Sequence, residues 1–150
     1  MKKTFISLLL VILPFIGLFD AGYVTYEVFS GRVPVCRPPF QCATVLENQW
    51  AYIAGLPLSF YGFIFYAIVF SLAVMNFLEI KQKRIKDVRG TLRKLATFGF
   101  LFAIYVLFLM AFVIKAWCLW CLISAIILTI FFITSRSLTI AKESPTKEDL

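Results

Sequence analysis

Four long apolar stretches alternate with polar segments along the chain. They cover approximately residues 4–29, 55–78, 95–114 and 117–134. A helix needs roughly 20 mostly apolar residues to cross the hydrocarbon core of a bilayer, and each stretch approaches or exceeds that length. The pattern therefore predicts an all-α membrane protein, a four-transmembrane-helix bundle with a long outer loop between helices 1 and 2.

Asp20 interrupts the first apolar stretch. Lys2 and Lys3 ahead of it suggest a signal peptide, but the apolar pattern continues past Asp20 without a small-residue cleavage site. We therefore interpret this stretch as a membrane helix. A carboxylate in such a helix is costly and is expected to face the bundle interior or the interface. We interpret Asp20 as a hydrogen-bonded helix-packing residue in preference to a proton relay.

The loop between the first two helices spans about residues 30–54. Its prolines, Pro34, Pro38 and Pro39, argue against a helix around the first cysteine. Residues 43–52 are expected to form a short helix at the membrane interface, where aromatic side chains settle among the lipid headgroups.

Basic residues are distributed unevenly along the chain. Twelve of the fifteen lie at the N-terminus, in the loop between the second and third stretches, or in the tail, and three lie on the other side. Cytoplasmic segments carry an excess of Lys and Arg, so both termini are expected to be cytoplasmic. We divide the chain into a four-helix transmembrane domain, residues 1–135, and a polar, loosely ordered cytoplasmic tail, residues 136–150. The basic loop is interpreted as a topology signal, and no nucleic-acid partner is expected.

Composition narrows the candidate chemistry. Hydrophobic residues make up 61% of the chain and charged residues 15%, and histidine is absent. Soluble domains are about 45–50% apolar, so these values also favour a membrane protein. Without histidine, the commonest general base and metal ligand is missing. The four cysteines are then the leading candidates for chemistry.

The cysteines form two pairs. Cys36 and Cys42 lie in the long loop, and Cys118 and Cys121 form a Cys-Leu-Trp-Cys motif at the start of the fourth helix. The predicted topology places all four at the extracytoplasmic face, where disulfides persist. Residues three apart are neighbours on a helix, and a thiol near a helix N-terminus is favoured as the thiolate that attacks disulfides. The arrangement favours a thiol–disulfide relay between the two pairs, which makes residues 1–135 a transmembrane redox domain.

Other uses of four cysteines remain open. They can form two static disulfides in a non-enzymatic membrane scaffold or transporter subunit, a four-cysteine zinc site, or small buried hydrophobic side chains. An outward conduit for reducing equivalents would need cysteines on the inner loops, and none is expected there. The relay is preferred because a membrane-helix CxxC faces a second pair in the outer loop.

Further residues resemble a known family. They are the run Gly17–Tyr26 (GLFDAGYVTY), Cys36, Cys42-Ala-Thr-Val-Leu46, Ala51–Ser59 (AYIAGLPLS), Gly62, Tyr66 and Cys118-Leu-Trp-Cys121. Taken in order over about residues 4–135, this arrangement resembles the bacterial, disulfide-bond-forming branch of the vitamin K epoxide reductase family.

The resemblance implies a four-helix bundle around a quinone pocket at the outer face of a bacterial cell membrane. It implies that the chain reoxidises a separate thioredoxin-fold thiol oxidase outside the membrane and passes the electrons to ubiquinone or menaquinone, without a metal. Cys36 is then the cysteine that forms a mixed disulfide with the partner. Cys42 exchanges with Cys118, and Cys121 lies beside the quinone ring. Reduction of vitamin K epoxide or of quinone alone is an alternative.

Five further residues are candidate quinone contacts. Asn48 occupies the position where the family commonly has a serine that hydrogen-bonds a quinone oxygen, although a cap or turn role is an equal alternative. The aromatic candidates near the outer face can stack on a quinone ring or serve as packing and belt residues: Phe60, Tyr61, Trp117 and Trp120.

Overall fold

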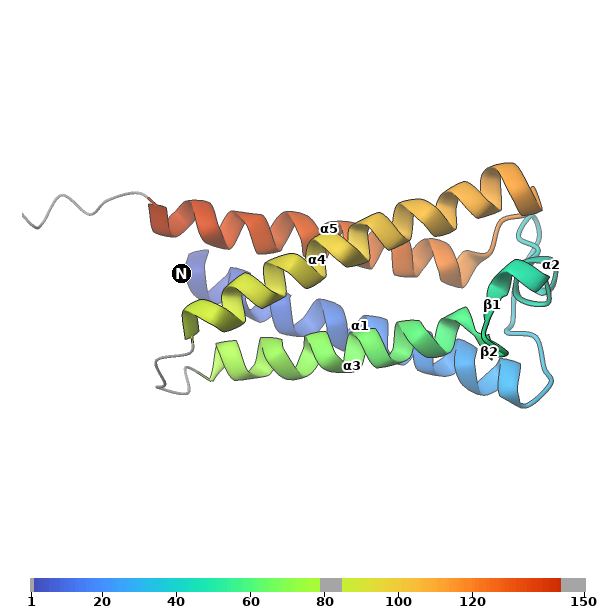
Figure 1. Ribbon diagram of the computed structural model, residues 1–150, viewed down its shortest axis with the longest axis horizontal. Helices are drawn as coiled ribbons and strands as arrows, with labels where there is room; N and C mark the ends of the chain where they lie inside the picture. The colour runs from blue at the N-terminus through green and yellow to red at the C-terminus, as the bar shows by residue number, and fades with distance from the viewer. Residues whose placement is uncertain (1, 79–84, 144–150) are drawn as a thin grey trace, which may run out of the picture.

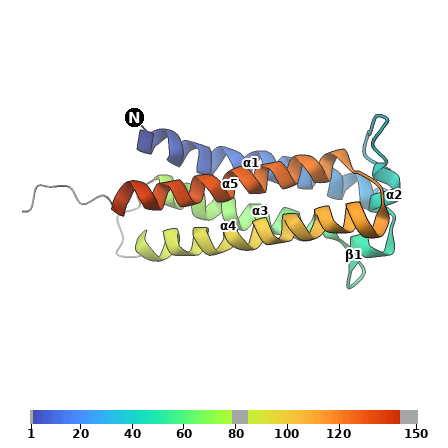
Figure 2. The same cartoon turned by 90° about the horizontal axis from the view of Figure 1, so that it is seen from above.

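The computed structural model describes residues 2–78 and 85–143 of the chain. Its long helices are α1 (Lys2–Phe29), α3 (Leu58–Phe77), α4 (Ile85–Phe108) and α5 (Leu119–Glu143), which run side by side (Figures 1 and 2). α4 continues as a π-helical segment, η2 (Leu109–Ile114). Each of the four helical stretches is long and apolar enough to cross a membrane. The prediction of a four-helix membrane bundle is confirmed.

Short elements fill the connection between α1 and α3. They are α2 (Cys42–Leu46), the 3₁₀ helix η1 (Gln49–Ala51), and the strands β1 (Tyr52–Ile53) and β2 (Leu56–Pro57), which pair antiparallel. The two-residue turn between the strands has Ala54 and Gly55 at positive φ, as a tight hairpin turn requires. These elements cover one end of the bundle.

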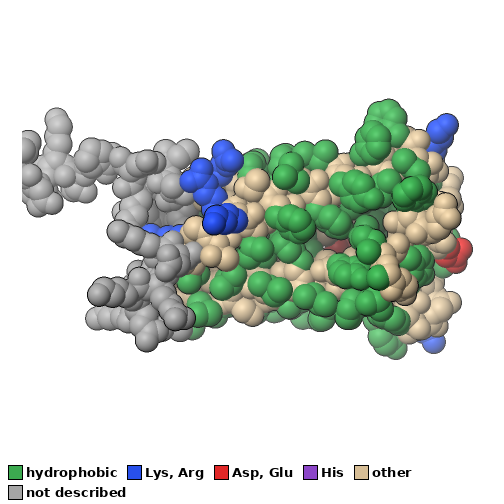
Figure 3. Space-filling view, in the orientation of Figure 1, with side chains coloured by type: hydrophobic (Ala, Val, Ile, Leu, Met, Phe, Trp, Pro, Cys, Tyr) green, Lys and Arg blue, Asp and Glu red, His purple; other side chains and the backbone are tan. Residues whose placement is uncertain are grey.

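Small residues bring the helices close together. α1 packs mainly against α3 and α5, and α4 packs mainly against α5. Lipid is as apolar as a leucine side chain, so membrane helices associate through close packing at small residues. The buried core accordingly contains a series of alanines, Ala21, Ala73, Ala96, Ala103 and Ala125. Large apolar side chains lie on the outside of the bundle instead, where lipid would surround them (Figure 3).

The two ends of the bundle differ in what they carry. The N-terminus of α1, the C-terminal part of α5 and the adjoining ends of α3 and α4 lie at one end, and the elements between α1 and α3 lie at the other (Figure 1). All four cysteines belong to the second end, as the sequence predicts. Which end is cytoplasmic stays a prediction from the distribution of charge.

Two helix boundaries differ clearly from the prediction, the start of α4 and the end of α5. α4 begins at Ile85, ten residues before the predicted start, because its basic segment is rich in helix-forming Lys and Arg. α5 continues to Glu143, so residues 136–143 are helical where a loosely ordered tail was expected. The hydroxyls of Thr134 and Ser135 donate to the carbonyls of Ile130 and Phe132, so these polar residues do not end the helix. Residues 144–150 lie outside the described part.

The interfacial helix expected over residues 43–52 is also divided. α2 ends at Leu46, and Asn48 begins η1 by accepting a hydrogen bond from the backbone N–H of Trp50 at 3.1 Å. Tyr52 already belongs to strand β1. An Asn side chain that caps the next turn interrupts a continuous helix.

Replacing Gly17 with alanine is expected to destabilise the bundle. A methyl group at Gly17 would overlap the ring of Tyr66, whose hydroxyl lies 2.8 Å from the hydroxyl of Ser124 and is thereby fixed in place. Overpacking of this kind costs about 1–3 kcal/mol. Gly90→Ala, where nothing lies within 4 Å of the added methyl, is the matched control. Thermal unfolding in detergent should show a lower midpoint for the first variant alone, and equal midpoints would contradict the packing described.

Candidate active site: four cysteines beside an apolar cavity

Cys36 and Cys42 form a disulfide in the loop between α1 and α3. Their Cα atoms lie 6.1 Å apart, within the usual range for a cystine. Cys42 is the first residue of α2 and is 1% exposed, whereas Cys36 is half-buried in a non-helical segment next to the exposed Val35. A nucleophile arriving from outside therefore reaches the sulfur of Cys36 before that of Cys42.

Cys118 and Cys121 are free thiols at the start of α5. The helix begins at Leu119, so Cys118 lies at its N-cap position. The Cys121 thiol and the backbone N–H groups of Cys121 and Trp120 donate hydrogen bonds to the Cys118 sulfur, and they hold the pKa of Cys118 below its ordinary value against the opposing effect of burial. Donors at a helix N-terminus favour a thiolate in this way. Cys118 is thus prepared for thiol–disulfide exchange.

The two pairs meet through Cys42 and Cys118. Both are essentially inaccessible, at 1% and 0% exposure, and both belong to one buried cluster with Met110. The backbone N–H of Gln41 donates to the carbonyl of Trp117 at 2.8 Å, which links the residues immediately before the two cysteines. The fold therefore buries the inner cysteine of the loop and the first cysteine of the CxxC motif in one cluster, and Cys36 and Cys121 are partly buried against it.

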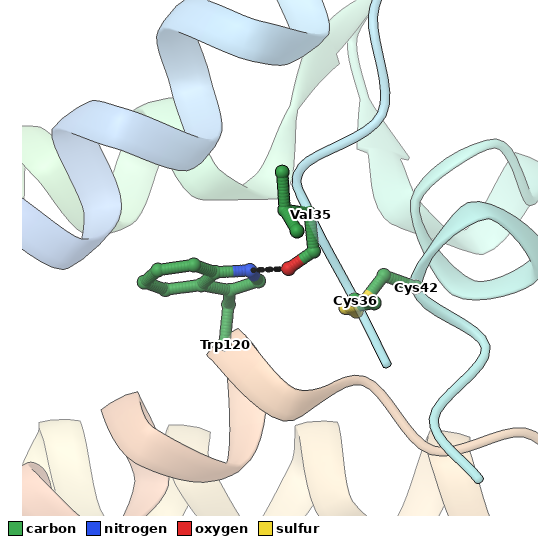
Figure 4. Close-up of a disulfide and its surroundings, with 4 residues drawn as sticks. All are labelled: Val35, Cys36, Cys42 and Trp120. Atoms are coloured by element: carbon green, nitrogen blue, oxygen red, sulfur yellow. Dashed lines mark hydrogen bonds between the residues drawn. A yellow bond between two sulfur atoms is a disulfide. The ribbon is translucent and has the colours of Figure 1, made fainter. Parts of the chain in front are cut away.

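A hydrogen bond from Trp120 connects α5 to the loop that precedes Cys36. The Trp120 indole N–H donates to the carbonyl of Val35 at 3.2 Å, across 85 positions of sequence (Figure 4). Its ring also packs on Tyr23 of α1, with centroids 4.8 Å apart. The second variable residue of the CxxC motif therefore holds the segment just before Cys36. The sequence offered Trp120 only as an aromatic surface, because a tryptophan pattern does not show which carbonyl the indole contacts.

An apolar cavity of about 110 Å³ lies between the helices beside this cluster. It is bounded by α1, α3, α4 with η2, and α5, and by parts of the loop. In Figure 3 the surface is hollowed between α3 and α4 near the cysteine end, and acidic atoms are visible inside the hollow. The polar side chains among its described lining residues are few: Asp20, Ser59, Ser124, Cys121 and the two indoles of Trp50 and Trp120.

Two buried polar atoms at this cavity lack hydrogen-bond partners. They are Oδ1 of Asp20 and Oγ of Ser59. Buried polar atoms are nearly always paired, so unpaired ones mark a place where a ligand or water completes the bonding. Asp20 was expected to be a hydrogen-bonded packing residue. It does interact with the Ser124 hydroxyl, but Oδ1 has no hydrogen-bond partner.

The predicted quinone contacts fall in two groups. Trp120 lines the cavity with Cys121, whereas Asn48, Phe60, Tyr61 and Trp117 are not among the described residues that line it. Their contact with a quinone stays a prediction.

Each of these four side chains has a structural partner or an outward position. Asn48 caps η1, Tyr61 donates to the Ile53 carbonyl at 3.1 Å, Phe60 packs on Phe29, and Trp117 is exposed. Ser59 and Ser124 were missed, because serines in an apolar helix carry no sequence signal of the direction they face. Asp20 could have been identified from the sequence, since a carboxylate inside a membrane helix marks a candidate functional site.

The cystine also bears on the zinc alternative. Zinc binds thiolates, and a disulfide removes two of the four that a four-cysteine site needs. Within residues 2–78 and 85–143, no three His, Cys, Asp or Glu side chains gather as metal ligands would.

The fold and the site together define a class of protein, an integral membrane protein with two cysteine pairs at one end of a four-helix bundle. The family model described as Vitamin K epoxide reductase family matches residues 8–136, and the chain belongs to that family. Family membership makes it a membrane thiol oxidoreductase. No individual curated protein matches the chain.

Removing the Cys121 donor is expected to raise the pKa of Cys118. In a chain with Cys36 and Cys42 replaced by serine, Cys118 is the one thiol left once Cys121 is also changed. Cys121→Ala deletes the first donor, so thiolate should form at a higher pH than in Cys121→Ser, whose hydroxyl still donates. Ultraviolet absorbance of the thiolate against pH measures this. Coincident titrations would show that the Cys121 side chain does not stabilise the Cys118 thiolate.

Proposed function

We propose that the chain belongs to the bacterial branch of the family and is a quinone-dependent thiol oxidoreductase. It takes electron pairs from a reduced thioredoxin-fold partner outside the membrane and passes them to membrane quinone. The proposal rests on one observation: the two cysteines of the CxxC motif have different neighbours. Cys118 packs with Cys42, and Cys121 opens into the apolar cavity. A path for two electrons therefore runs from the loop to the cavity.

The relay consists of two exchanges. A thiolate of the partner attacks Cys36, which is the accessible end of the loop disulfide, and Cys42 is released as a thiolate. Cys42 then attacks Cys118 of the oxidised Cys118–Cys121 pair, and Cys121 leaves as a thiolate. Resolution of the mixed disulfides by the partner's second thiol and by Cys36 restores the loop disulfide. The chain then holds the Cys36–Cys42 disulfide and two thiols at Cys118 and Cys121, which is the state of this structure.

The cavity fits a quinone headgroup in chemical terms. Such a ring is flat and apolar, with two carbonyl oxygens that accept hydrogen bonds. The cavity walls are largely apolar, and the unpaired Ser59 hydroxyl would be a donor for one carbonyl oxygen. When bound, quinone supplies a two-electron, two-proton acceptor. The net reaction is partner dithiol plus quinone giving partner disulfide plus quinol, so electrons and protons balance.

The direct test follows both substrates at once. The purified chain in lipid vesicles is given a soluble quinone and a reduced thioredoxin-fold protein, and loss of partner thiols and of quinone are recorded. One quinone should disappear for each partner dithiol, with no reaction in a chain whose four cysteines are serine. A membrane scaffold with static disulfides would show no cysteine-dependent turnover, and that result would remove the proposal. Replacing quinone by vitamin K epoxide tests the alternative acceptor.

A further inference from the structure

Among the described residues that line the cavity, Asp20 is the only one with a charged side chain. It lies on α1, is 8% exposed, and has Oδ1 unpaired. Burying a carboxylate at membrane depth without a cation is costly, and such a residue marks a candidate functional site. Neither thiol–disulfide exchange of the proposed relay uses the Asp20 carboxylate. Its role must therefore lie in another step.

The groups that face Asp20 come from two other helices. From α5 and the residue that precedes it, the Ser124 hydroxyl interacts with the Asp20 carboxylate, and Cys118 and Cys121 interact with it electrostatically. From α3, Tyr66 interacts with it electrostatically and holds Ser124 through a hydrogen bond of 2.8 Å. No Lys or Arg is among the described lining residues. Asp20 is therefore surrounded by proton-bearing groups, and no cation neutralises it there.

Quinone reduction needs protons at this place. Hydrogen bonds lower the pKa of Cys118, so Cys118 loses its proton first and the last proton of the reduced pair is the one on Cys121. That proton must leave the sulfur as the Cys118–Cys121 bond forms. The chain has no histidine to accept it, and the cavity walls are largely apolar.

We propose that Asp20 accepts the proton of Cys121 through its unpaired oxygen and delivers it to the oxygen of the acceptor in the cavity. The inference rests on the proposed function. The two sulfurs lose two electrons and become a disulfide, and the acceptor gains them. One proton travels from Cys121 through Asp20. The second enters from the outer aqueous phase and replaces the proton that Cys118 released on ionising.

Asp20→Asn is the decisive variant, because an amide has nearly the same shape and carries no transferable proton. The chain is first reduced at Cys118 and Cys121, then mixed with a soluble quinone, and formation of the disulfide is followed in a single turnover. Loss of a positioned general base slows a step by about 10²–10⁴-fold, and we expect a decrease of that order. Asp20→Glu should recover much of the rate. Thr25→Val, a change at a buried polar residue of α1 outside the cavity lining, should leave it unaltered.

Two measurements without quinone separate proton transfer from a structural effect. Oxidised Asp20→Asn should still convert one equivalent of reduced partner at the wild-type rate, since exchange through Cys42 and Cys118 does not use Asp20. Reduction of the Cys118–Cys121 disulfide in wild type should perturb an infrared carboxyl band that Asp20→Asn lacks.

The two proposals fail in different ways. If the reduced wild-type pair is not oxidised by quinone, the proposed function is wrong. If wild type and Asp20→Asn are oxidised equally fast, or no carboxyl band responds in wild type, the role of Asp20 alone is overturned.

Discussion

Replacing Cys42 with serine is expected to stop electron transfer from a thioredoxin-fold partner to the Cys118–Cys121 pair completely. Cys36 is then left without its disulfide, so a partner thiolate has no sulfur–sulfur bond to attack at the outer surface. Cys118 cannot replace this function, because it is 0% exposed beneath α2 and the loop. The measurement is the loss of partner thiols in the presence of quinone.

Loss of the loop disulfide also perturbs the local structure, so the variant needs two comparisons. Thr44→Ser, an equally small change at an exposed position of α2, should leave transfer intact. Chemically reduced Cys118 and Cys121 should still be oxidised by quinone in Cys42→Ser, which shows that the bundle and the cavity remain formed. Continued oxidation of the partner by Cys42→Ser would mean that another route reaches the inner pair.

The fold was accessible from the sequence because hydrophobic length and the positions of charges determine membrane helices almost alone. Four apolar stretches became α1, α3, α4 with η2, and α5. The boundaries were less accessible. Lys and Arg are good helix formers in water as well as near a membrane, so α4 starts within its basic segment. α5 continues past its apolar stretch because the hydroxyls of Thr134 and Ser135 bond to carbonyls of the preceding turn.

The candidate site was accessible in part. The Cys36–Cys42 disulfide agrees with the loop pair that the sequence indicated, and the CxxC spacing indicated the second pair. The cavity wall was not predictable, because it depends on which face of each helix turns inward. A strongly apolar helix has little amphipathic pattern to report that direction. The sequence therefore did not identify Ser59 and Ser124 as cavity residues. Asn48, predicted as a quinone contact, caps η1.

The contact between the pairs makes a second prediction with a large effect. In the double variant Cys36→Ser/Cys121→Ser, Cys42 and Cys118 are the two cysteines left, and mild oxidation is expected to join them almost completely. They share one buried cluster, and the hydrogen bond from Gln41 to Trp117 holds the preceding residues together at 2.8 Å. The lowered pKa of Cys118 also supplies the thiolate that the reaction consumes. Mass mapping of non-reduced peptides measures the product.

The reciprocal pair provides the comparison. In Cys42→Ser/Cys118→Ser, the remaining Cys36 and Cys121 are only partly buried against the same cluster, Cys36 in the loop and Cys121 at the cavity, whereas Cys42 and Cys118 lie inside the cluster. Their oxidation should be slower by at least an order of magnitude, because a disulfide forms only where the Cβ atoms approach within about 3.5–4.5 Å. If both double variants formed disulfides equally fast, the loop would have to move freely over the end of the bundle. The Trp120 hydrogen bond to Val35 would then not fix the order of the relay, and Cys42 would lose its distinction as the cysteine that passes electrons inward.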